Sequence, residues 1–198
     1  MSAVSTDPVV VGILLLAAGR SRRFGSDKRR ARLAHSDRTV LQMALDAVTG
    51  SGLPTRVCLR PDDSALAEAL ASQGIDALQC QRAHEGMGAT LAEGVTRVTE
   101  WQGVIIALAD MPRVLATTYR ELARHSTQDA AIVPVYRGQR GNPVCFGASW
   151  YARLMQCAGQ SGARHLLEAH PQGVSHLAVD DPGVLRDVDY PGDLGAMR

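Results

Sequence analysis

The stretch VVVGILLLAAGRSRRFGSDK, residues 9–28, decides the fold, because it joins a long apolar run directly to a basic loop that contains glycine. Residues 9–16 are apolar without alternation and are interrupted only by Gly12, a pattern typical of a strand buried on both faces of a parallel sheet. In an open α/β sheet, ligands bind in the loops at the carboxyl ends of the strands. We therefore expect residues 9–16 to form a central strand and residues 16–28 to form a ligand-binding loop.

This loop is unusually basic. Residues 20–32 carry one acidic side chain, Asp27, and seven basic ones, namely Arg20, Arg22, Arg23, Lys28, Arg29, Arg30 and Arg32. At an effective dielectric constant near 20, two unit charges about 4 Å apart interact by roughly 4 kcal/mol, so this density requires water or a bound anion. Gly19 and Gly25 let the backbone approach an anion and expose its N–H groups. The pattern favours a phosphate-binding loop, and the alternative is a solvated basic loop.

The loop matches neither of the common phosphate-binding motifs. A P-loop has four residues between its glycines and a lysine directly after the second, whereas five residues separate Gly19 from Gly25 and Lys28 comes three positions later. The pattern GxGxxG is absent from the chain. Lys28 is nevertheless distinctive, because it is the single lysine among 21 basic residues, and an ammonium group contacts phosphate oxygens as a point charge.

Strand-like and helical patterns alternate over the first two thirds of the chain, which predicts a parallel sheet covered by helices. Further strands are expected at residues 56–59, 75–80 and 104–108. Apolar residues at positions 40, 41, 44, 45 and 48 have helical spacing and stop at Gly50 and Gly52, which predicts a first helix.

Two more helices are expected in this part. Asp62 or Asp63 is predicted to cap the second, which should end at Gly74. Its inward-facing residues are expected to be Leu66, Ala69 and Leu70. The third should follow Gly86 and Gly88, with a buried face formed by Leu91, Val95 and Val98.

The last third has a looser order. Residues 130–136 and 144–146 resemble two strands joined by a turn-rich segment, which indicates antiparallel pairing. Helices are expected near residues 150–157 and 163–169, and a last strand near 176–179. With 198 residues and no linker or repeat, the chain is expected to form a single α/β domain over residues 1–198, Rossmann-like and three-layered, with a mostly parallel mixed sheet.

Composition excludes several functional classes. A net charge of +1 and eight aromatic residues argue against nucleic-acid binding. The longest apolar run is about half of the roughly 20 residues needed to cross a bilayer, and Asp7 with no preceding basic residue argues against a secretion signal. The cysteines Cys58, Cys80, Cys145 and Cys157 lack CxxC spacing, so we expect free thiols in a cytoplasmic protein.

The loop LAAGRSRRFGSDK at residues 16–28 resembles the signature of the MobA/MocA-like nucleotidyltransferases, in which a LA(A/G)G start, an arginine, a Met or Phe, a glycine and a lysine follow in this order. Further matching segments occur in the same order along nearly the whole chain. They are EGMGATL (85–91), ADMP (109–112), GNPV (141–144) and DVDYPGDL (187–194). The resemblance implies a fold like that of the nucleotide-diphospho-sugar transferases.

The same resemblance implies a set of site residues. Leu16, Ala17, Ala18, Gly19, Arg23, Lys28 and Gly88 would bind the nucleotide, with Lys28, Arg23 and Asp110 as the catalytic group. Asp110 and Asp189 would bind the metal. A carboxylate at the end of a buried strand suits Mg²⁺, which prefers one or two carboxylates together with phosphate oxygens and water.

Each acidic residue also has a purely structural interpretation. Asp110 would instead cap a helix that starts near Pro112, and Asp189 would form a turn before Pro191. Relatives usually have apolar residues after the lysine, whereas this chain has Arg29, Arg30 and Arg32. These arginines either contact a second anionic substrate or lie on the solvated surface. His84 and His165 are further acid–base candidates, but attack by an ionised phosphate needs little proton transfer.

The resemblance implies transfer of a nucleoside monophosphate from an NTP to a phosphorylated small molecule with release of pyrophosphate. LAAG resembles the CTP users that make molybdopterin cytosine dinucleotide, so Ala18 favours CTP and a molybdenum cofactor cytidylyltransferase that requires Mg²⁺. The alternatives are a GTP-using molybdopterin guanylyltransferase, which SDK at 26–28 slightly favours, an enzyme for another phosphorylated metabolite, or a non-catalytic molybdopterin-binding chaperone. A molybdoenzyme or its maturation chaperone is the expected protein partner.

Overall fold

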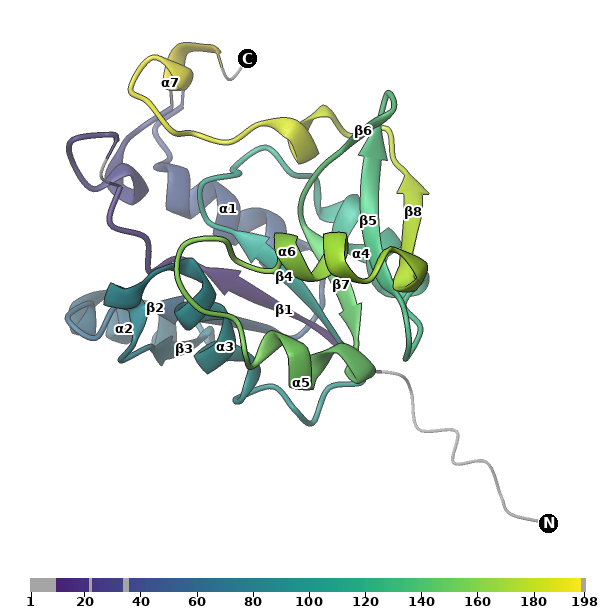
Figure 1. Ribbon diagram of the computed structural model, residues 1–198. Coiled ribbons are helices and arrows are strands. Elements are labelled where there is room, and N and C mark those ends of the chain that lie inside the picture. Colours follow the sequence, from purple (N-terminus) through teal and green to yellow (C-terminus); the bar gives the residue numbers. More distant parts are fainter. Residues whose placement is uncertain (1–9, 22, 34–35, 197–198) are drawn as a thin grey trace.

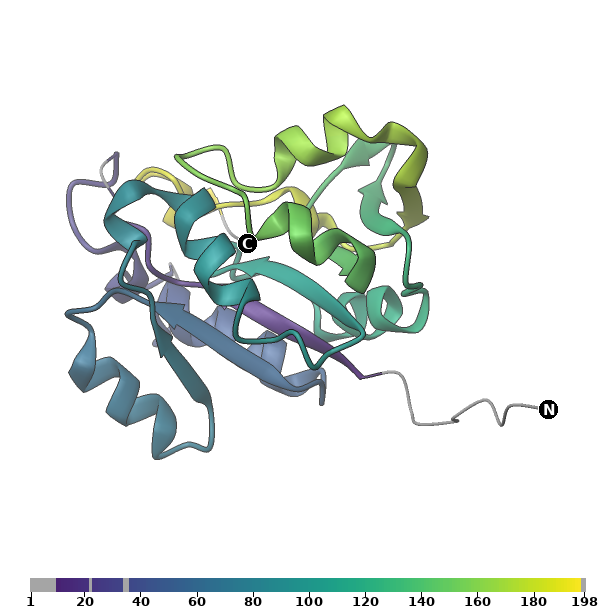
Figure 2. The same ribbon diagram turned by 60° about the horizontal axis from the view of Figure 1, so that its bottom comes forward.

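The computed structural model describes residues 10–21, 23–33 and 36–196, so Asp7, Val9 and Arg22 lie outside the described residues. One mixed sheet of eight strands forms the centre of the fold (Figure 1; Figure 2). The strands are β1 (Val11–Leu16), β2 (Thr55–Leu59), β3 (Asp76–Gln79), β4 (Gly103–Leu108), β5 (Ala131–Tyr136), β6 (Gln139–Arg140), β7 (Val144–Gly147) and β8 (Val174–Ala178). Each strand predicted from the sequence is therefore present, with ends that differ by at most two residues.

The strand order is β3-β2-β1-β4-β7-β5-β6, and β8 pairs with β5. Strands β3, β2, β1 and β4 run parallel to one another. Strand β7 is antiparallel to both β4 and β5, whereas β8 is parallel to β5. The predicted mostly parallel mixed sheet and its antiparallel excursion are thus confirmed.

Strand β1 is buried on both faces, as its uninterrupted apolar run predicts. Ile13 and Leu15 pack into the core on one side of the sheet, and Leu14 and Leu16 pack into the core on the other. Fully burying a side chain of this size contributes about 1.5–3 kcal/mol, so the two cores hold the strand firmly between helix layers. The loop that follows β1 therefore starts from a rigid support.

Helices cover both faces of the sheet. They are α1 (Val40–Gly50), α2 (Ser64–Ala71), α3 (Met87–Val95), α4 (Ala116–Arg124), α5 (Tyr151–Leu154), α6 (Arg164–Ala169) and α7 (Asp193–Ala196). Helices α1, α2 and α4 contribute to the core that contains Ile13, and α3, α5 and α6 contribute to the core that contains Leu14. Figure 1 shows α3 and α5 in front of the sheet and α1 and α4 behind it, which gives the predicted three-layer α/β arrangement.

Helix α1 begins and ends as its sequence predicts. The Gln42 N–H donates to the Thr39 hydroxyl, and the Thr39 N–H donates to the Gln42 side chain, which forms a capping box. Gly52 follows the helix with a φ of 75°, a conformation that glycine adopts without strain.

Helix α2 differs from the prediction in two respects. Ala69 is exposed, and only Leu70 of the three expected inward residues is fully buried. Asp63 occupies the N-cap position but makes no capping hydrogen bond with its side chain. Its carboxylate is used in a different contact, described below.

The strand order reverses next to β1. From β1 the chain adds β2 and then β3 on one side, and β4 returns to the other side of β1. In open α/β sheets this switch point opens a crevice at the carboxyl ends of the two diverging strands. The loop after Leu16 and the segment after Leu108 meet at this point.

After β8, the C-terminal segment returns across the carboxyl end of the sheet (yellow in Figure 1). Buried Asp181 anchors it by accepting hydrogen bonds from the Leu115 N–H at 2.9 Å and from the Thr118 hydroxyl at 2.6 Å. Farther on, the Val188 N–H donates to the Asp110 carbonyl oxygen at 2.8 Å. The segment thereby brings Asp187 and Asp189 to the switch point.

Candidate active site

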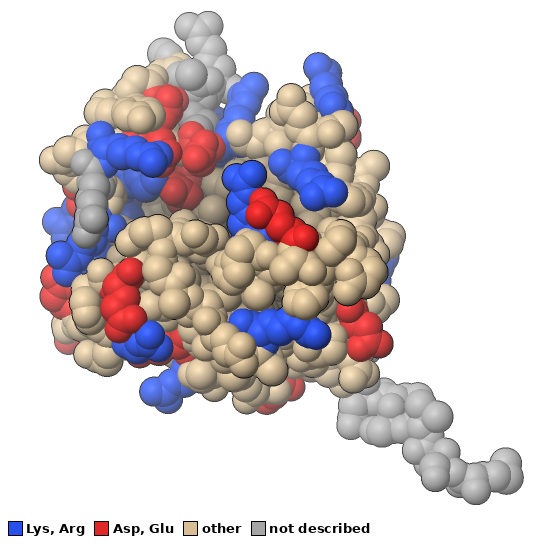
Figure 3. Space-filling view, in the orientation of Figure 1, with Lys and Arg blue, Asp and Glu red and all other residues tan. Residues whose placement is uncertain are grey.

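A cleft of about 580 Å³ lies at the switch point between β1 and β4. It is lined by Leu16, Ala17, Ala18, Gly19, Arg20, Ser21, Arg23, Phe24, Lys28, Arg29, Ala83, His84, Gly86, Met87, Thr90, Leu108, Ala109, Asp110, Gln160, Asp187 and Asp189. Figure 3 shows acidic and basic side chains side by side around a hollow in this face. The lining contains every residue predicted from the sequence for nucleotide or metal binding except Gly88.

Lys28 connects three of the segments that form the cleft. It belongs to a short 3-10 helix, Lys28–Arg30, after the first loop, and its Nζ lies 2.6 Å from Asp110 Oδ2. The same Nζ lies 3.3 Å from Asp189 Oδ1 and donates to the Val188 carbonyl oxygen at 2.8 Å. One ammonium group therefore holds together side chains that are 82 and 161 residues apart in the sequence.

The surroundings of Lys28 keep it charged. Its side chain is 15% exposed, and that burial alone would lower its pKa. The charges and hydrogen bonds of Asp110 and Asp189 outweigh the burial and raise the pKa of Lys28 above its ordinary value of 10.5. Lys28 is therefore a fixed positive charge at the mouth of the cleft.

Arg23 adds a more mobile positive charge at the rim. Its NH1 lies 3.1 Å from Asp189 Oδ2, but its side chain is 70% exposed. An ion pair as exposed as this one contributes at most about 1 kcal/mol. Arg23 is thus free to exchange its carboxylate partner for an anion that enters the cleft.

The acidic residues offer hard oxygen ligands. Among the described residues, Asp110 Oδ1 is buried and has no hydrogen-bond partner, which is a costly state for a carboxylate oxygen. The carboxylate of Asp189 forms an ion pair at 3.3 Å with the same Lys28 ammonium group that Asp110 contacts. The described residues contain no group of three or more His, Cys, Asp or Glu side chains suited to a metal. Two carboxylates are enough for Mg²⁺ when phosphate and water supply the remaining oxygens, so the donors fit that ion.

The structural interpretations of Asp110 and Asp189 are wrong. The helix after Asp110 starts at Ala116, and Leu115 occupies its N-cap position. The turn near Pro191 is held by Asp193, whose carboxylate accepts from the N–H groups of Asp189 and Tyr190 at 2.8 and 2.7 Å. Both Asp110 and Asp189 instead direct a carboxylate to Lys28.

Gly88 is not part of the cleft. It lies inside α3, and its N–H donates to the Gly159 carbonyl oxygen at 2.8 Å. A side chain at this position would collide with the backbone of Ala158, so the glycine permits close packing of the loop before Gln160. Its neighbours Met87 and Thr90 line the cleft instead.

Sequence reasoning missed Asp187. Its carboxyl group lines the cleft, and burial together with the charges of Asp189 and Asp110 raises its pKa above the ordinary 3.8. The signal was available, since Asp187 is the first residue of the DVD triplet that contains Asp189. Successive residues of an extended segment point to opposite sides, so residues spaced by two point to the same side, and this pair was a candidate for one shared site.

Neither interpretation offered for Arg29 is correct. Arg29 is buried and forms ion pairs with Asp27 at 2.7 Å and with Asp63 at 2.6 Å. It is therefore neither solvated nor available to a second substrate. The carboxylate of Asp63, which is distant in the sequence, forms an ion pair with Arg29. This contact also explains why Asp63 does not cap α2. Arg30 and Arg32 are exposed, and Arg32 has only a loose ion pair with Asp37 at 3.6 Å.

The Arg29–Asp63 pair makes stability depend on pH. Burial alone would raise the pKa of Asp63, but the hydrogen bonds and charge of Arg29 outweigh it and lower the pKa below its ordinary value of 3.8. A lowered folded-state pKa means that the carboxylate stabilises the fold above about pH 3.8 and that this contribution is lost as the pH falls through the folded value.

We predict that Asp63→Asn lowers the free energy of unfolding by roughly 1–3 kcal/mol at pH 7, because a charged hydrogen bond is lost. The difference from the parent protein should shrink as the pH falls below 3.8 and through the lowered pKa of Asp63, because the carboxyl group then becomes protonated. Urea unfolding at both pH values measures this, and Asp46→Asn, which alters the exposed ion pair with Arg38, is the control. An equal loss at both pH values would contradict the assignment.

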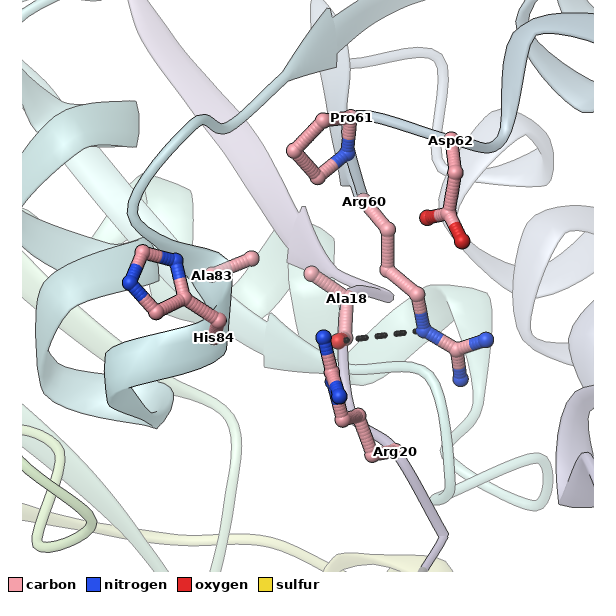
Figure 4. A pocket seen from close by; sticks show the side chains of 7 residues that line it. All are labelled: Ala18, Arg20, Arg60, Pro61, Asp62, Ala83 and His84. Carbon is pink, nitrogen blue, oxygen red and sulfur yellow. Dashed lines mark hydrogen bonds between the residues drawn. The ribbon is translucent and has the colours of Figure 1, made fainter.

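A second hollow of about 290 Å³ opens beside the cleft. Figure 4 shows its lining, which consists of Ala18, Arg20, Arg60, Pro61, Asp62, Ala83 and His84. Arg60 Nε donates to the Ala18 carbonyl oxygen at 3.4 Å, drawn as a dashed line. The two hollows share Ala18, Arg20, Ala83 and His84, so they form one continuous surface, whereas His165 lines neither.

The cysteines take no part in the cleft. Cys58, Cys80, Cys145 and Cys157 are buried and free, as predicted. Burial raises the pKa of the Cys145 thiol to about 11, which disfavours the thiolate that nucleophilic catalysis needs. Separately, none of the described helices is long and apolar enough to cross a membrane.

Comparisons with known proteins agree with this geometry. The model of the MobA-like NTP transferase domain matches residues 13–174. Rv0371c from Mycobacterium tuberculosis H37Rv is similar, with 29% identity, a TM-score of 0.81, and coverage of 94% of this chain and 96% of that one. A manganese complex of the same mycobacterial protein gives 28% identity, a TM-score of 0.77, and coverage of 93% and 95%.

A more distant structure shares the fold. Molybdopterin-guanine dinucleotide biosynthesis protein A from Archaeoglobus fulgidus has 19% identity, a TM-score of 0.68, and coverage of 92% of this chain and 94% of that one. A search of curated proteins gave no match. The family match includes most of β1, the basic loop and the segment that contains Asp110, which form much of the cleft, whereas Asp187 and Asp189 lie beyond the matched residues. The chain therefore belongs to the MobA-like NTP transferase family and is a nucleotidyltransferase of that family.

Proposed function

We propose that the protein transfers CMP from CTP to the terminal phosphate of molybdopterin, giving the cytosine dinucleotide cofactor and pyrophosphate. The observation that carries this proposal is the contact of 2.6 Å between Lys28 Nζ and Asp110 Oδ2 at the switch point of the sheet. A positive charge and a carboxylate with one unpartnered oxygen stand there beside the LAAG loop, which suits a triphosphate and its cation.

In the proposed reaction, an oxygen of the acceptor phosphate attacks the α-phosphorus of CTP in line. The bond from the α-phosphorus to the oxygen that bridges it to the β-phosphorus breaks, and that oxygen leaves with its electron pair as part of pyrophosphate. Because the attacking phosphate is already ionised, no protein base is required. The work of the chain is to position the two phosphates and to stabilise the charge that grows on the leaving group.

Three groups of residues divide this work. Leu16, Ala17, Ala18 and Gly19 supply backbone to the triphosphate, while Lys28 and Arg23 supply positive charge to the leaving pyrophosphate. Asp110 and Asp189 would hold Mg²⁺, which when bound neutralises phosphate charge. The manganese complex of the mycobacterial neighbour supports a divalent cation in this fold.

The nucleotide and the acceptor follow from separate observations. Ala18 lines both hollows, and the LAAG form of the loop, in which it is the second alanine, supports CTP. Molybdopterin is supported by the family resemblance and by the fold shared with the A. fulgidus protein. We propose a cytoplasmic enzyme whose residues 1–198 form one nucleotidyltransferase domain, with a molybdoenzyme or its maturation chaperone as the protein partner.

Pyrophosphate release tests this function directly. The purified protein is incubated with molybdenum cofactor, Mg²⁺ and one of CTP, GTP, ATP or UTP, and pyrophosphate is measured. We expect release with CTP at a rate at least about tenfold above that with the other nucleotides, equivalent to about 1.4 kcal/mol of discrimination. Preferential release with GTP would identify a guanylyltransferase. No release with any nucleotide, when the cofactor is confirmed active, would overturn the proposed acceptor.

A further inference from the structure

Two arginines contact the backbone of the nucleotide-binding loop. Arg29 is buried, and its guanidinium group contacts the carboxylates of Asp27 and Asp63. Arg60, at the end of β2, has its NH1 3.5 Å from Asp27 Oδ2, and its backbone N–H donates to Asp63 Oδ2 at 3.0 Å. These four residues, Asp27, Arg29, Arg60 and Asp63, form a cluster that we call the carboxylate–arginine cluster.

The cluster contacts three successive carbonyl groups of the loop. Arg29 NH1 donates to the Ala17 carbonyl oxygen at 2.9 Å, and Arg60 Nε donates to that of Ala18 at 3.4 Å. Arg60 NH2 also donates to the Gly19 carbonyl oxygen. Figure 4 shows the Ala18 carbonyl directed at the Arg60 side chain. The oxygen atoms of residues 17–19 are thus held on the side of the loop that faces β2.

Peptide geometry then determines where the N–H groups point. In a planar trans peptide, the N–H of one residue is directed opposite to the carbonyl of the residue before it. The N–H groups of Ala18, Gly19 and Arg20 are therefore directed away from the arginines, toward the side of β4 and Asp110. Within residues 10–21, 23–33 and 36–196, these three N–H groups make no hydrogen bond. Three unpaired donors in succession form a concave site for an anion.

The charges of the cluster balance, because two guanidinium groups meet two carboxylates. Neither arginine therefore has an excess charge to offer a substrate, and Arg29, although it borders the cleft, is a buried residue. A guanidinium group is suited to this work, since its fork of donors can bind a carbonyl and two carboxylates together. A lysine ammonium cannot span the same three partners in the same geometry.

We infer that the carboxylate–arginine cluster orients the N–H groups of Ala18, Gly19 and Arg20 toward the triphosphate, and that Arg29 is a positioning residue for nucleotide binding. This inference rests on the proposed nucleotidyl transfer at the same cleft. It gives a function to the arginine that follows the only lysine of the chain.

Arg29→Lys in the full chain is the test variant, because it keeps the charge and removes the fork. Arg38→Lys makes the same exchange in an exposed ion pair with Asp46 and is the matched control. Binding of inorganic tripolyphosphate in the presence of Mg²⁺ is measured by calorimetry. The backbone amide signals of Ala18, Gly19 and Arg20 are followed by NMR, and KM and kcat for the NTP are determined well below the melting temperature of each variant.

We expect Arg29→Lys to weaken tripolyphosphate binding and raise KM by about tenfold or more while kcat falls by less than about threefold. The three amide signals should shift on binding in the parent protein and in Arg38→Lys, and shift less in Arg29→Lys. A variant that only melts earlier, with unchanged binding and KM, would show that Arg29 is merely structural and overturn the inference. If the parent protein itself binds no tripolyphosphate or NTP, the proposed function fails, and this inference fails with it.

Discussion

The Asp110→Asn variant is expected to fold like the parent protein and to release pyrophosphate at least about a hundredfold more slowly. The substitution keeps the size of the side chain but removes the negative charge that faces Lys28 at 2.6 Å. It also replaces one of the two carboxylates proposed to hold the divalent cation. Turnover under saturating CTP, acceptor and Mg²⁺ measures the effect, and calorimetric titration with Mn²⁺ measures the loss of cation binding independently.

The fold should survive this change. Lys28 keeps its contacts with Asp189 and the Val188 carbonyl, so the loss of one charged hydrogen bond costs about 1–3 kcal/mol. Circular dichroism and urea unfolding check this expectation, with Asp46→Asn as a control for removal of an exposed carboxylate. Full delivery of cofactor to a molybdoenzyme by Asp110→Asn would favour the non-catalytic chaperone over the enzyme.

The second large effect is expected from Lys28→Arg. This exchange is harmless on a solvated loop, but Lys28 is 15% exposed and its Nζ is enclosed by oxygens of Asp110, Val188 and Asp189. A planar guanidinium group is larger than an ammonium group and cannot occupy the same point between these oxygens. We expect kcat for pyrophosphate release to fall by about 10²-fold or more, since the charge that stabilises the leaving group is displaced.

Two measurements distinguish this explanation from misfolding. Urea unfolding should leave the m-value of Lys28→Arg unchanged, which reports the same change in exposed surface as in the parent protein. The second variant, Lys28→Met, removes the charge while keeping the apolar stem and should lose at least as much activity. Turnover by Lys28→Arg within about threefold of the parent would place Lys28 on a solvated loop and contradict its proposed role.

Much of the fold was predictable because its signals are local. The uniformly apolar sequences of β1 and β4 predicted that both faces of these strands are buried. Helical spacing of apolar residues, with glycine at the end, predicted α1. The prediction was less accurate for two helices, because α4 was not expected and Ala69 of α2 proved to be exposed. Small apolar residues tolerate either environment, so spacing alone does not determine which side of a short helix is covered.

The candidate site was predictable in part for a different reason. Gly19, Lys28 and Asp110 belong to motifs whose order along the chain is typical of the family, and the structure brings Gly19, Lys28 and Asp110 into one cleft. Gly88 belongs to an equally good motif, yet its N–H is bonded to Gly159. A motif identifies residues that a fold requires, but it does not distinguish those that contact a ligand from those that permit close packing.

The contacts of Arg29 could not be predicted. A cluster of basic residues read along the chain predicts solvent or an anion, because the sequence contains one nearby acid, Asp27. The second partner, Asp63, is 34 residues away and approaches only because β2 pairs with β1. Two arginines in the same basic run, Arg29 and Arg30, therefore have opposite environments, one buried among carboxylates and one exposed.

The sequence by itself determined the central strand, the layers of helices and the identity of a basic loop that ends in the only lysine. These depend on hydrophobic periodicity and residue type within short windows, which act before distant parts meet. Only the tertiary structure decided that Lys28 faces Asp110 and Asp189, since strand order and the returning C-terminal segment bring them together across 82 and 161 residues. Ion pairing depends on distance in space, and the packing of the sheet determines that distance.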